Sequence, residues 1–199
     1  DTKLRVHNAS TGDAVLLLTS TANWQVGVDN SDSDKFKISN DDSFGANIRM
    51  QIDSAGAITA PAQPAFLVHP ASQQANIATS SYVEVVFGTE VFDQGADFAS
   101  NTFTAPVTGR YQLNVTIALE GVDTGAGFYV VRIATSNRNY DYLWNTIEYA
   151  SDDGKLYISN SVLADMDASD TAVVQVQENG GAQQTDIETD SRFSGFLAC

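Results

Sequence analysis

The residues best suited to chemistry in this sequence are carboxylates gathered in predicted turns. Asp165, Asp167 and Asp170 stand within six positions of one another. Calcium binds about six to eight oxygen atoms, and three identical chains that meet at one axis could supply that number. We therefore regard this run as a candidate calcium site and expect no other cofactor, although a solvated acidic turn is the simpler interpretation.

A second group of carboxylates, Asp29, Asp32 and Asp34, lies in an earlier predicted turn. It lacks the bidentate glutamate and the fixed spacing of the common calcium loop. A solvated turn is therefore the expected structure at this position.

Three aromatic residues, Tyr140, Tyr142 and Trp144, alternate along a predicted strand. Flat aromatic faces stack on pyranose rings, so this row is a candidate sugar-binding surface. An aromatic row with a period of two residues also suits the inward or subunit-facing side of a strand. The sequence favours the second interpretation.

Two polar connections are the remaining candidates for ligand contacts. They are residues 121–127, which include Asp123, and residues 178–190, which include Asn179. Binding residues concentrate on such loops when a rigid scaffold holds them. Flexible hairpin tips have the same composition, so the sequence leaves both interpretations open.

No catalytic arrangement emerges from the other reactive residues. His7 and His69 fall in different predicted domains, and Cys199 is the last residue of the sequence. The sequence contains no nucleophile elbow, zinc-protease motif or phosphate-binding loop. We expect a protein that is not an enzyme, and we leave open a spatial pair of carboxylates for glycoside cleavage.

The acidic composition excludes several classes of partner. Lys and Arg number 10 against 25 Asp and Glu, the net charge is −15, and the basic residues are scattered singly. Nucleic acids and anionic membrane surfaces both attract clustered positive charge, and no apolar run approaches the length of a transmembrane helix. We therefore expect neither nucleic acid binding nor membrane insertion. The chain begins at Asp1, and we expect further sequence upstream.

Alternating apolar residues separated by turns predict an all-β protein. No segment keeps helical periodicity over three turns. The predicted strands of residues 1–60 are centred on Leu4 and Val6, Ala14–Leu18, Trp24–Val28, Phe36 and Ile38, and Ile48–Ile52. Such a meander buries too little surface to be stable alone, and the single cysteine allows no intrachain disulfide. We therefore expect identical chains to share one core.

Residues 61–64 contain two prolines and form a predicted linker to a second domain, residues 65–199. Strands are predicted there at residues 65–69, 80–87, 101–104, 128–134, 141–147, 155–164, 171–177 and 191–197. The longest alternation, Tyr111, Leu113, Val115, Ile117 and Leu119, predicts a further strand with one buried face.

Two features flank that long strand. We expect Pro106 and Gly109 to turn the chain before it, because proline fixes φ and glycine accepts a positive φ. We expect Phe92, Phe98 and Phe103 to fill the core, where each buried ring contributes about 1.5–3 kcal/mol.

The second domain resembles the globular head of complement C1q and its TNF-like relatives. The resemblance covers about residues 64–199 and is carried by a Phe-Asp pair, spaced phenylalanines, an Ala-Pro-x-x-Gly-x-Tyr motif and a Phe-Ser-Gly-Phe-Leu ending. These residues are Phe92-Asp93, Phe98, Phe103, Ala105-Pro106, Gly109, Tyr111 and Phe193–Leu197. Ser169 departs from the family pattern, because the family has glycine before the aspartate at Asp170. The resemblance implies a ten-stranded jelly roll that forms a homotrimer, and relatives often bind calcium near the trimer apex.

The first segment resembles the trimeric stalks of tailed-bacteriophage fibres. The signature at its end consists of Ile52, Asp53, Gly56, Ile58 and Thr59. This second resemblance covers residues 1 to about 60 and implies a short-strand trimeric fibre stalk.

Together the two resemblances imply the receptor-binding tip of a bacteriophage tail fibre. Such a tip belongs to the virion, is extracellular, and adheres to a bacterial surface glycan or protein without enzymatic activity. One alternative is a bacterial or spore-surface protein with a C1q-like head, which upstream collagen-like repeats would favour. Another is a polysaccharide depolymerase, which would release new reducing ends from a host glycan.

Overall fold

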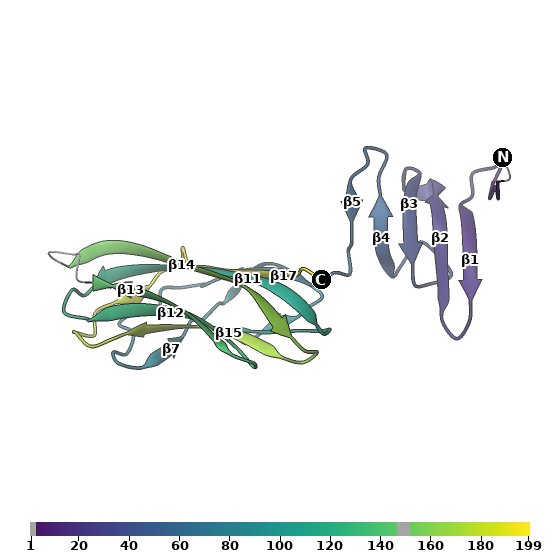
Figure 1. Ribbon diagram of the computed structural model, residues 1–199. Coiled ribbons are helices and arrows are strands. Elements are labelled where there is room, and N and C mark those ends of the chain that lie inside the picture. Colours follow the sequence, from purple (N-terminus) through teal and green to yellow (C-terminus); the bar gives the residue numbers. More distant parts are fainter. Residues whose placement is uncertain (1–2, 147–151) are drawn as a thin grey trace. The chain divides into compact units, whose positions relative to one another are not determined.

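A computed structural model describes residues 3–146 and 152–199, and its contacts divide the chain into two units (Figure 1). We call Asp1–Gln63 the stalk and Pro64–Cys199 the head. The division falls within the predicted linker, residues 61–64. Apart from one 3-10 helix, η1 (Asn30–Asp32), the described elements are strands. No helix among the described residues has the length and apolar character to cross a membrane.

The stalk is a single antiparallel meander in which each strand pairs with the next. Its strands are β1 (Ala14–Thr19), β2 (Asn23–Asp29), β3 (Lys35–Ser39), β4 (Ile48–Ile52) and β5 (Ile58–Thr59). The predicted strand at Leu4 and Val6 is wrong, because no neighbouring strand pairs with it and Leu4 is 87% exposed. The fifth strand is β5, in which Ile58 pairs with Ile52.

One face of the stalk sheet is apolar and open. Residues paired across antiparallel strands lie on the same side of a sheet, and the registers collect apolar side chains on one side. This apolar face comprises Ala14, Leu16, Leu18, Trp24, Val26, Val28, Phe36, Ile38, Met50, Ile52 and Ile58. None of the eleven is buried, and Ile58 is 63% exposed.

The opposite face of the stalk sheet buries polar groups instead. Gln25, Asp29 and Lys37 are all less than 5% exposed. The Lys37 ammonium lies 2.7 Å from Asp29 Oδ2 and 2.6 Å from Asp32 Oδ2. Among the described residues of the stalk, Phe44 is the only buried apolar side chain. The described stalk therefore has almost no apolar core of its own.

The head is a sandwich of two six-stranded sheets, drawn as two layers in Figure 1. Its strands are β6 (Ala65–His69), β7 (Tyr82–Glu84), β8 (Thr89–Gln94), β9 (Phe98–Ala99), β10 (Thr102–Thr104), β11 (Gly109–Val122), β12 (Phe128–Thr135), β13 (Asn139–Asn145), β14 (Asp153–Met166), β15 (Thr171–Glu178), β16 (Asp186–Ile187) and β17 (Arg192–Leu197). One sheet has the order β14-β11-β17-β6-β8, with β16 beside β11. The other has the order β13-β12-β15-β10-β9, with β7 beside β15. The predicted all-β jelly roll is confirmed.

The strand boundaries differ from the prediction in three places. Twelve strands are described rather than ten, since the two-residue strands β9 and β16 count separately. The predicted strand at residues 80–87 is limited to β7, which starts after Ser80, a residue with a positive φ of 60°, and ends at Glu84. The predicted end of a strand at Ile147 lies outside the described residues.

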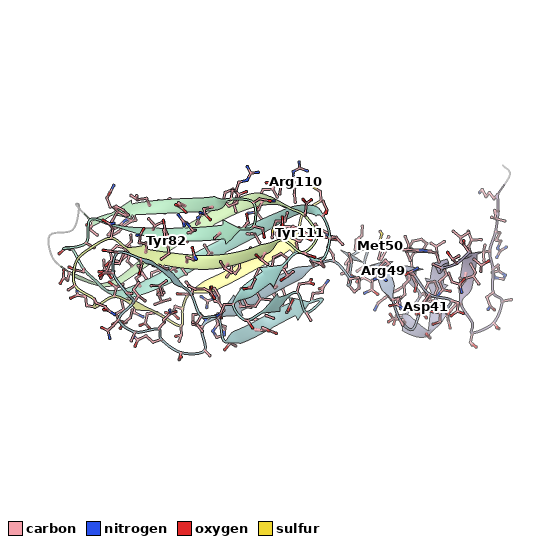
Figure 2. The ribbon with its side chains drawn as sticks, turned by 90° about the horizontal axis from the view of Figure 1, so that it is seen from below. Asp41, Arg49, Met50, Tyr82, Arg110 and Tyr111 are labelled. Carbon is pink, nitrogen blue, oxygen red and sulfur yellow. The ribbon has the colours of Figure 1, made fainter. Side chains whose placement is uncertain are left out.

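The core of the head lies between the two sheets and is centred on β11. Its five predicted inward residues, Tyr111, Leu113, Val115, Ile117 and Leu119, are all at most 2% exposed. Figure 2 shows neighbouring residues of this strand pointing to opposite sides, with Tyr111 inside the head and Arg110 outside it.

Two expectations around β11 are wrong. Phe92 is 49% exposed, because the register of β6 with β8 shifts between Leu67 and Val68 and pairs Phe92 with Leu67 on the outer face. The other two predicted phenylalanines are buried. Gly109 does not have a positive φ; a Cβ atom at this position would lie only 2.7 Å from the carbonyl oxygen of Cys199. Close packing, and not backbone conformation, requires glycine there.

Candidate binding surface at the loop end of the head

The head has two different ends, joined by the long strand β11. At about 3.4 Å per residue, its 14 residues span roughly 45 Å. Its start lies beside the C-terminus, because Arg110 N donates to Cys199 O at 2.7 Å. Leu197 N donates to Pro64 O at 3.1 Å, so the chain enters and leaves the head at this end. We call the opposite end the loop end: residues 121–127 and 179–185 with Asp152.

Asp123 and Asn179, the two predicted loop contacts, are both part of the loop end. Asn179 donates its N–H to Phe128 O at 2.9 Å and accepts a bond from Gly127 N at 2.8 Å. The Asp123 carboxylate is 7% exposed and accepts bonds from the backbone N–H groups of Gly125 and Ala182. Asp123 therefore ties the two loops together, and its carboxylate is used within the protein.

Asp152 provides a third connection at the loop end. Its Oδ1 accepts bonds from Thr124 N at 3.0 Å and from Thr124 Oγ1 at 2.7 Å. Its Oδ2 accepts a bond from Gln184 Nε2 at 3.3 Å. The bonds from Thr124 and Gln184 lower the pKa of this exposed carboxyl, which stays ionised. The loop end is thus cross-linked and presents polar and acidic groups.

Beneath these loops lies a buried polar cluster that sequence reasoning missed. Tyr129 Oη accepts a bond from Asp123 N at 2.9 Å and lies 2.8 Å from Thr185 Oγ1. Burial raises the pKa of Tyr129 to about 12. Glu178 is fully buried beside them. The signal for Glu178 was available, because it continues the inward alternation of β15.

The aromatic row lies on β13, which is an edge strand of its sheet. Tyr140 and Trp144 pack against the hydrophobic core, and the Trp144 ring lies 6.2 Å from that of Tyr129. Tyr142 is 49% exposed. Two of the three rings are therefore used in packing, and only Tyr142 presents a large exposed surface for a sugar.

The predicted calcium residues lie at the other end of the head, near the C-terminus. Asp165 lies 3.1 Å from the Arg138 guanidinium. Asp170 Oδ2 accepts bonds from Asp167 N at 2.8 Å and from Asn137 Nδ2 at 3.0 Å. These contacts stabilise the turn that carries them.

Within one chain, the carboxylates do not assemble a metal centre. No group of three acidic, histidine or cysteine side chains in the described ranges, 3–146 and 152–199, could hold a metal ion. In the stalk, the positive charges beside Asp29 and Asp32 are the ammonium groups of Lys37 and Lys35. A calcium site assembled from Asp165, Asp167 and Asp170 of several chains stays a prediction.

The outer face of the β14-β11-β17-β6-β8 sheet carries exposed apolar side chains. Leu163 on β14 and Phe196 on β17 both pair with Gln112 on β11, so the three lie in one row. Leu163 is 53% exposed and Phe196 is 48% exposed. Phe92 on β8 is exposed on the same face in the next row, because it pairs with Leu67, which pairs with Ser194. We call Leu163 and Phe196, with Phe92 beside them, the outer apolar row.

Comparison with known proteins shows which protein family and which solved structures the head is similar to. Residues 65–198 match the family model of the C1q domain. Among solved structures, the globular domain of zebrafish complement 1qA protein aligns with a TM-score of 0.49 and 18% identity, over 69% of this chain and 98% of that chain. Murine APRIL at pH 8.0 aligns with a TM-score of 0.47 and 15% identity, over 68% of this chain and 98% of that chain. No curated protein matches the chain.

Proposed function

We propose that this chain, which belongs to the C1q domain family through residues 65–198, is the receptor-binding tip of a homotrimeric bacteriophage tail fibre. In this proposal the chain belongs to the virion, lies outside the host cell, and adheres to a glycan or protein of the bacterial surface. It binds without catalysing a reaction.

The observation that carries the proposal is the open apolar face of the stalk. Its members include Leu18, Trp24 and Ile58, which are 56%, 41% and 63% exposed in a single chain. Burial of each large apolar side chain contributes about 1.5–3 kcal/mol, so a sheet with eleven apolar residues on one face gains most by packing against like faces. Three copies that turn this face inward would form a stalk with one shared core.

The outer apolar row of the head supplies a second contact between copies. Leu163, Phe196 and Phe92 lie on one face of one sheet. A homotrimer that buries this row would leave three copies of the loop end exposed. Three copies on one rigid support raise the strength of attachment above that of one site, which suits adhesion to a surface with many receptors.

The polar character of the loop end supports binding rather than catalysis. Asp123 and Asp152 already accept hydrogen bonds from the loops they connect. Hydroxyl and amide groups of a glycan or peptide are suitable ligands for the exposed side chains of this end, which include Gln183 and Asp152. Tyr142, with its exposed ring, is a further proposed contact for a sugar.

Light scattering on the purified chain tests the assembly. We expect a mass three times the 21.3 kDa of one chain at micromolar concentration. A monomer would contradict both the stalk and the head parts of the proposal.

An adsorption assay tests the biological role. The purified chain should bind whole bacterial cells of the host and block adsorption of the virus, and no new reducing ends should appear in the host polysaccharide. Release of reducing ends would instead identify a depolymerase. Collagen-like repeats upstream, in place of neighbouring tail genes, would favour a cell-surface or spore-surface protein.

A further inference from the structure

Glu178 is an unusual residue of the head because it is an acidic side chain placed among apolar ones. It ends β15, where Ala172, Val174 and Val176 occupy the preceding inward positions and are all fully buried. The Glu178 side chain is likewise 0% exposed. A buried carboxylate that lacks compensation is costly, so such a group is held in the neutral form.

The Glu178 carboxyl is only partly compensated in the described structure. Neither Oε1 nor Oε2 makes a hydrogen bond of normal geometry, although each is buried. Tyr129 from β12 and Thr185 from the loop before β16 both influence this carboxyl, and Tyr129 pairs directly with Glu178 in the sheet. Tyr129 Oη and Thr185 Oγ1 already contact each other at 2.8 Å.

The charged and titratable groups around Glu178 disfavour its ionised form. Burial raises the pKa of the Glu178 carboxyl, and the negative charge of Asp123, on the loop after β11, adds to this effect. Tyr129 and Thr185 offset part of it. Among the described residues that influence this carboxyl, none is a lysine, arginine or histidine.

Glu178 is also the residue at which β15 gives way to a loop. Its carbonyl oxygen accepts a hydrogen bond from Ser80 N at 2.7 Å. The next residue, Asn179, donates its N–H to Phe128 O and accepts a bond from Gly127 N. Gly180 and Gly181 follow with φ values of 81° and 79°, a conformation that glycine adopts without strain. The backbone directly after the buried acid therefore turns through two glycines, and Gly181 packs closely against Asp123.

We propose that Glu178 is a proton-controlled latch of the loop end. With its proton bound, the carboxyl remains in the core and can donate a hydrogen bond to Thr185 or Tyr129, and residues 121–127 and 179–185 stay closed over it. When the proton leaves, the carboxylate needs water, and the loops open to hydrate it. Control of receptor binding by this latch rests on the proposed function, whereas the loop movement itself does not.

The sign of the effect follows from proton linkage. The closed state binds the proton more tightly than the open state, in which the carboxyl meets water and has a pKa near its ordinary value of 4.5. Closure is therefore most stable below pH 4.5 and weakens as pH rises towards the pKa of the closed state. Over that interval the opening constant rises by up to about tenfold for each pH unit.

Amide hydrogen exchange of the full-length chain tests the latch, because it reports loop opening without a receptor. Protection factors, corrected for the intrinsic dependence of exchange on pH, are measured across a pH series. In the unmodified chain, we expect protection at residues 121–127 and 179–185 to fall by up to about tenfold per pH unit above pH 4.5. Amides of β11 should remain protected throughout.

Two variants separate the latch from general charge effects. Glu178→Gln keeps the size of the side chain but cannot ionise, so protection of the loops should be independent of pH. Glu90→Gln, at an exposed position, should retain the pH dependence of the unmodified chain.

The latch is overturned if the unmodified loops show constant protection, if Glu178→Gln retains the pH dependence, or if β11 loses protection in parallel. If Glu178→Gln does not fold, the pH series on the unmodified chain decides by the same criteria for the loops and β11. Failure of the adsorption assay leaves this result unaffected.

Discussion

The stalk and the head both contain strands that alternate apolar and polar residues. The head buries the apolar residues of its strands, whereas the stalk buries polar ones. In β11 of the head, Leu113 and Ile117 are fully buried. In β2 of the stalk, Gln25 and Asp29 are buried, and Trp24 is 41% exposed. The head completes its core within one chain by adding a second sheet, whereas the described stalk consists of one sheet. The difference indicates that the head can fold alone and that the stalk needs other copies of itself.

Cutting the chain between the stalk and the head should change the folding of the stalk more than any substitution below. If the chain is cut between Gln63 and Pro64, we expect residues 64–199 to unfold cooperatively as a stable domain. Residues 1–63 should be unfolded when dilute and should fold only as their concentration rises, because they bury little apolar surface alone. Circular dichroism across a dilution series measures this. A stalk fragment that stays folded as a monomer would break the comparison.

A charge on the apolar face should disrupt the stalk and leave the head intact. Leu18→Asp would place a carboxylate in each of three chains within the proposed shared core, and each chain also loses about 1.5–3 kcal/mol of apolar burial. We expect proteases to digest the stalk of this variant up to the linker and to spare the head. Thr19→Asp, one residue away on the opposite face, is the matched control and should behave as the unmodified chain does.

Asp29 of the stalk and Glu178 of the head should contribute to stability in opposite directions as pH changes. A hydrogen bond from Lys37 lowers the pKa of Asp29 below its ordinary value of 3.8, so the contribution of Asp29 to stalk stability is present above pH 3.8 and is lost as pH falls through the lowered pKa. The pKa of Glu178 is raised, so its contribution to the stability of the head is greatest below pH 4.5 and declines as pH rises.

The two tryptophans allow this contrast to be measured in one protein. Trp24 lies in the stalk and Trp144 in the head, so Trp144→Phe and Trp24→Phe leave one fluorescent reporter in each unit. Denaturant titrations across a pH series should give slopes of opposite sign for the two variants. Slopes of the same sign would show that Asp29 and Glu178 do not govern how the stability of each unit depends on pH.

The smallest expected effect concerns a strained turn of the head. Ser169 has a φ of 78°, a region that costs a residue with a side chain about 1–2 kcal/mol. Ser169→Gly should therefore raise the free energy of unfolding by up to about 1 kcal/mol, after allowance for the greater flexibility of glycine. Ser194→Gly, within β17, is the control and should lower it by about 0.5–1 kcal/mol. Thermal unfolding of the head distinguishes the two.

Much of the head could be predicted because its alternation is regular. The inward residues of β11, from Tyr111 to Leu119, follow directly from a period of two. Phe92 could not be placed in the same way, because a register shift between β6 and β8 reverses which residues face outward. Such a shift depends on the pairing of two strands and leaves no mark in the pattern of either one.

The candidate site was predictable in its position but not in its chemistry. Loop composition selected Asp123 and Asn179 as candidate ligand contacts, and the structure places both at one end of the sandwich, where polar glycine-containing segments connect strands. Their contact with a ligand stays a prediction. The sequence did not predict that the Asp123 carboxylate accepts hydrogen bonds within its own loop and from the loop at Ala182. The bond from Ala182 joins residues far apart in the chain. The burial of Glu178 is hard to predict, because an acidic residue before a polar tract is typical of a loop.

The chain enters and leaves the head at the same end, and this arrangement has a mechanical consequence. Force applied at Pro64 while a receptor holds the loop end acts along β6, the strand that follows Pro64. β6 pairs with β17 through four residue pairs and with β8 through five. A pull along paired strands loads all of these contacts at once, whereas a pull across them would open them one after another. A head attached in this way can bear tension between Pro64 and the loop end without separating from its first strand.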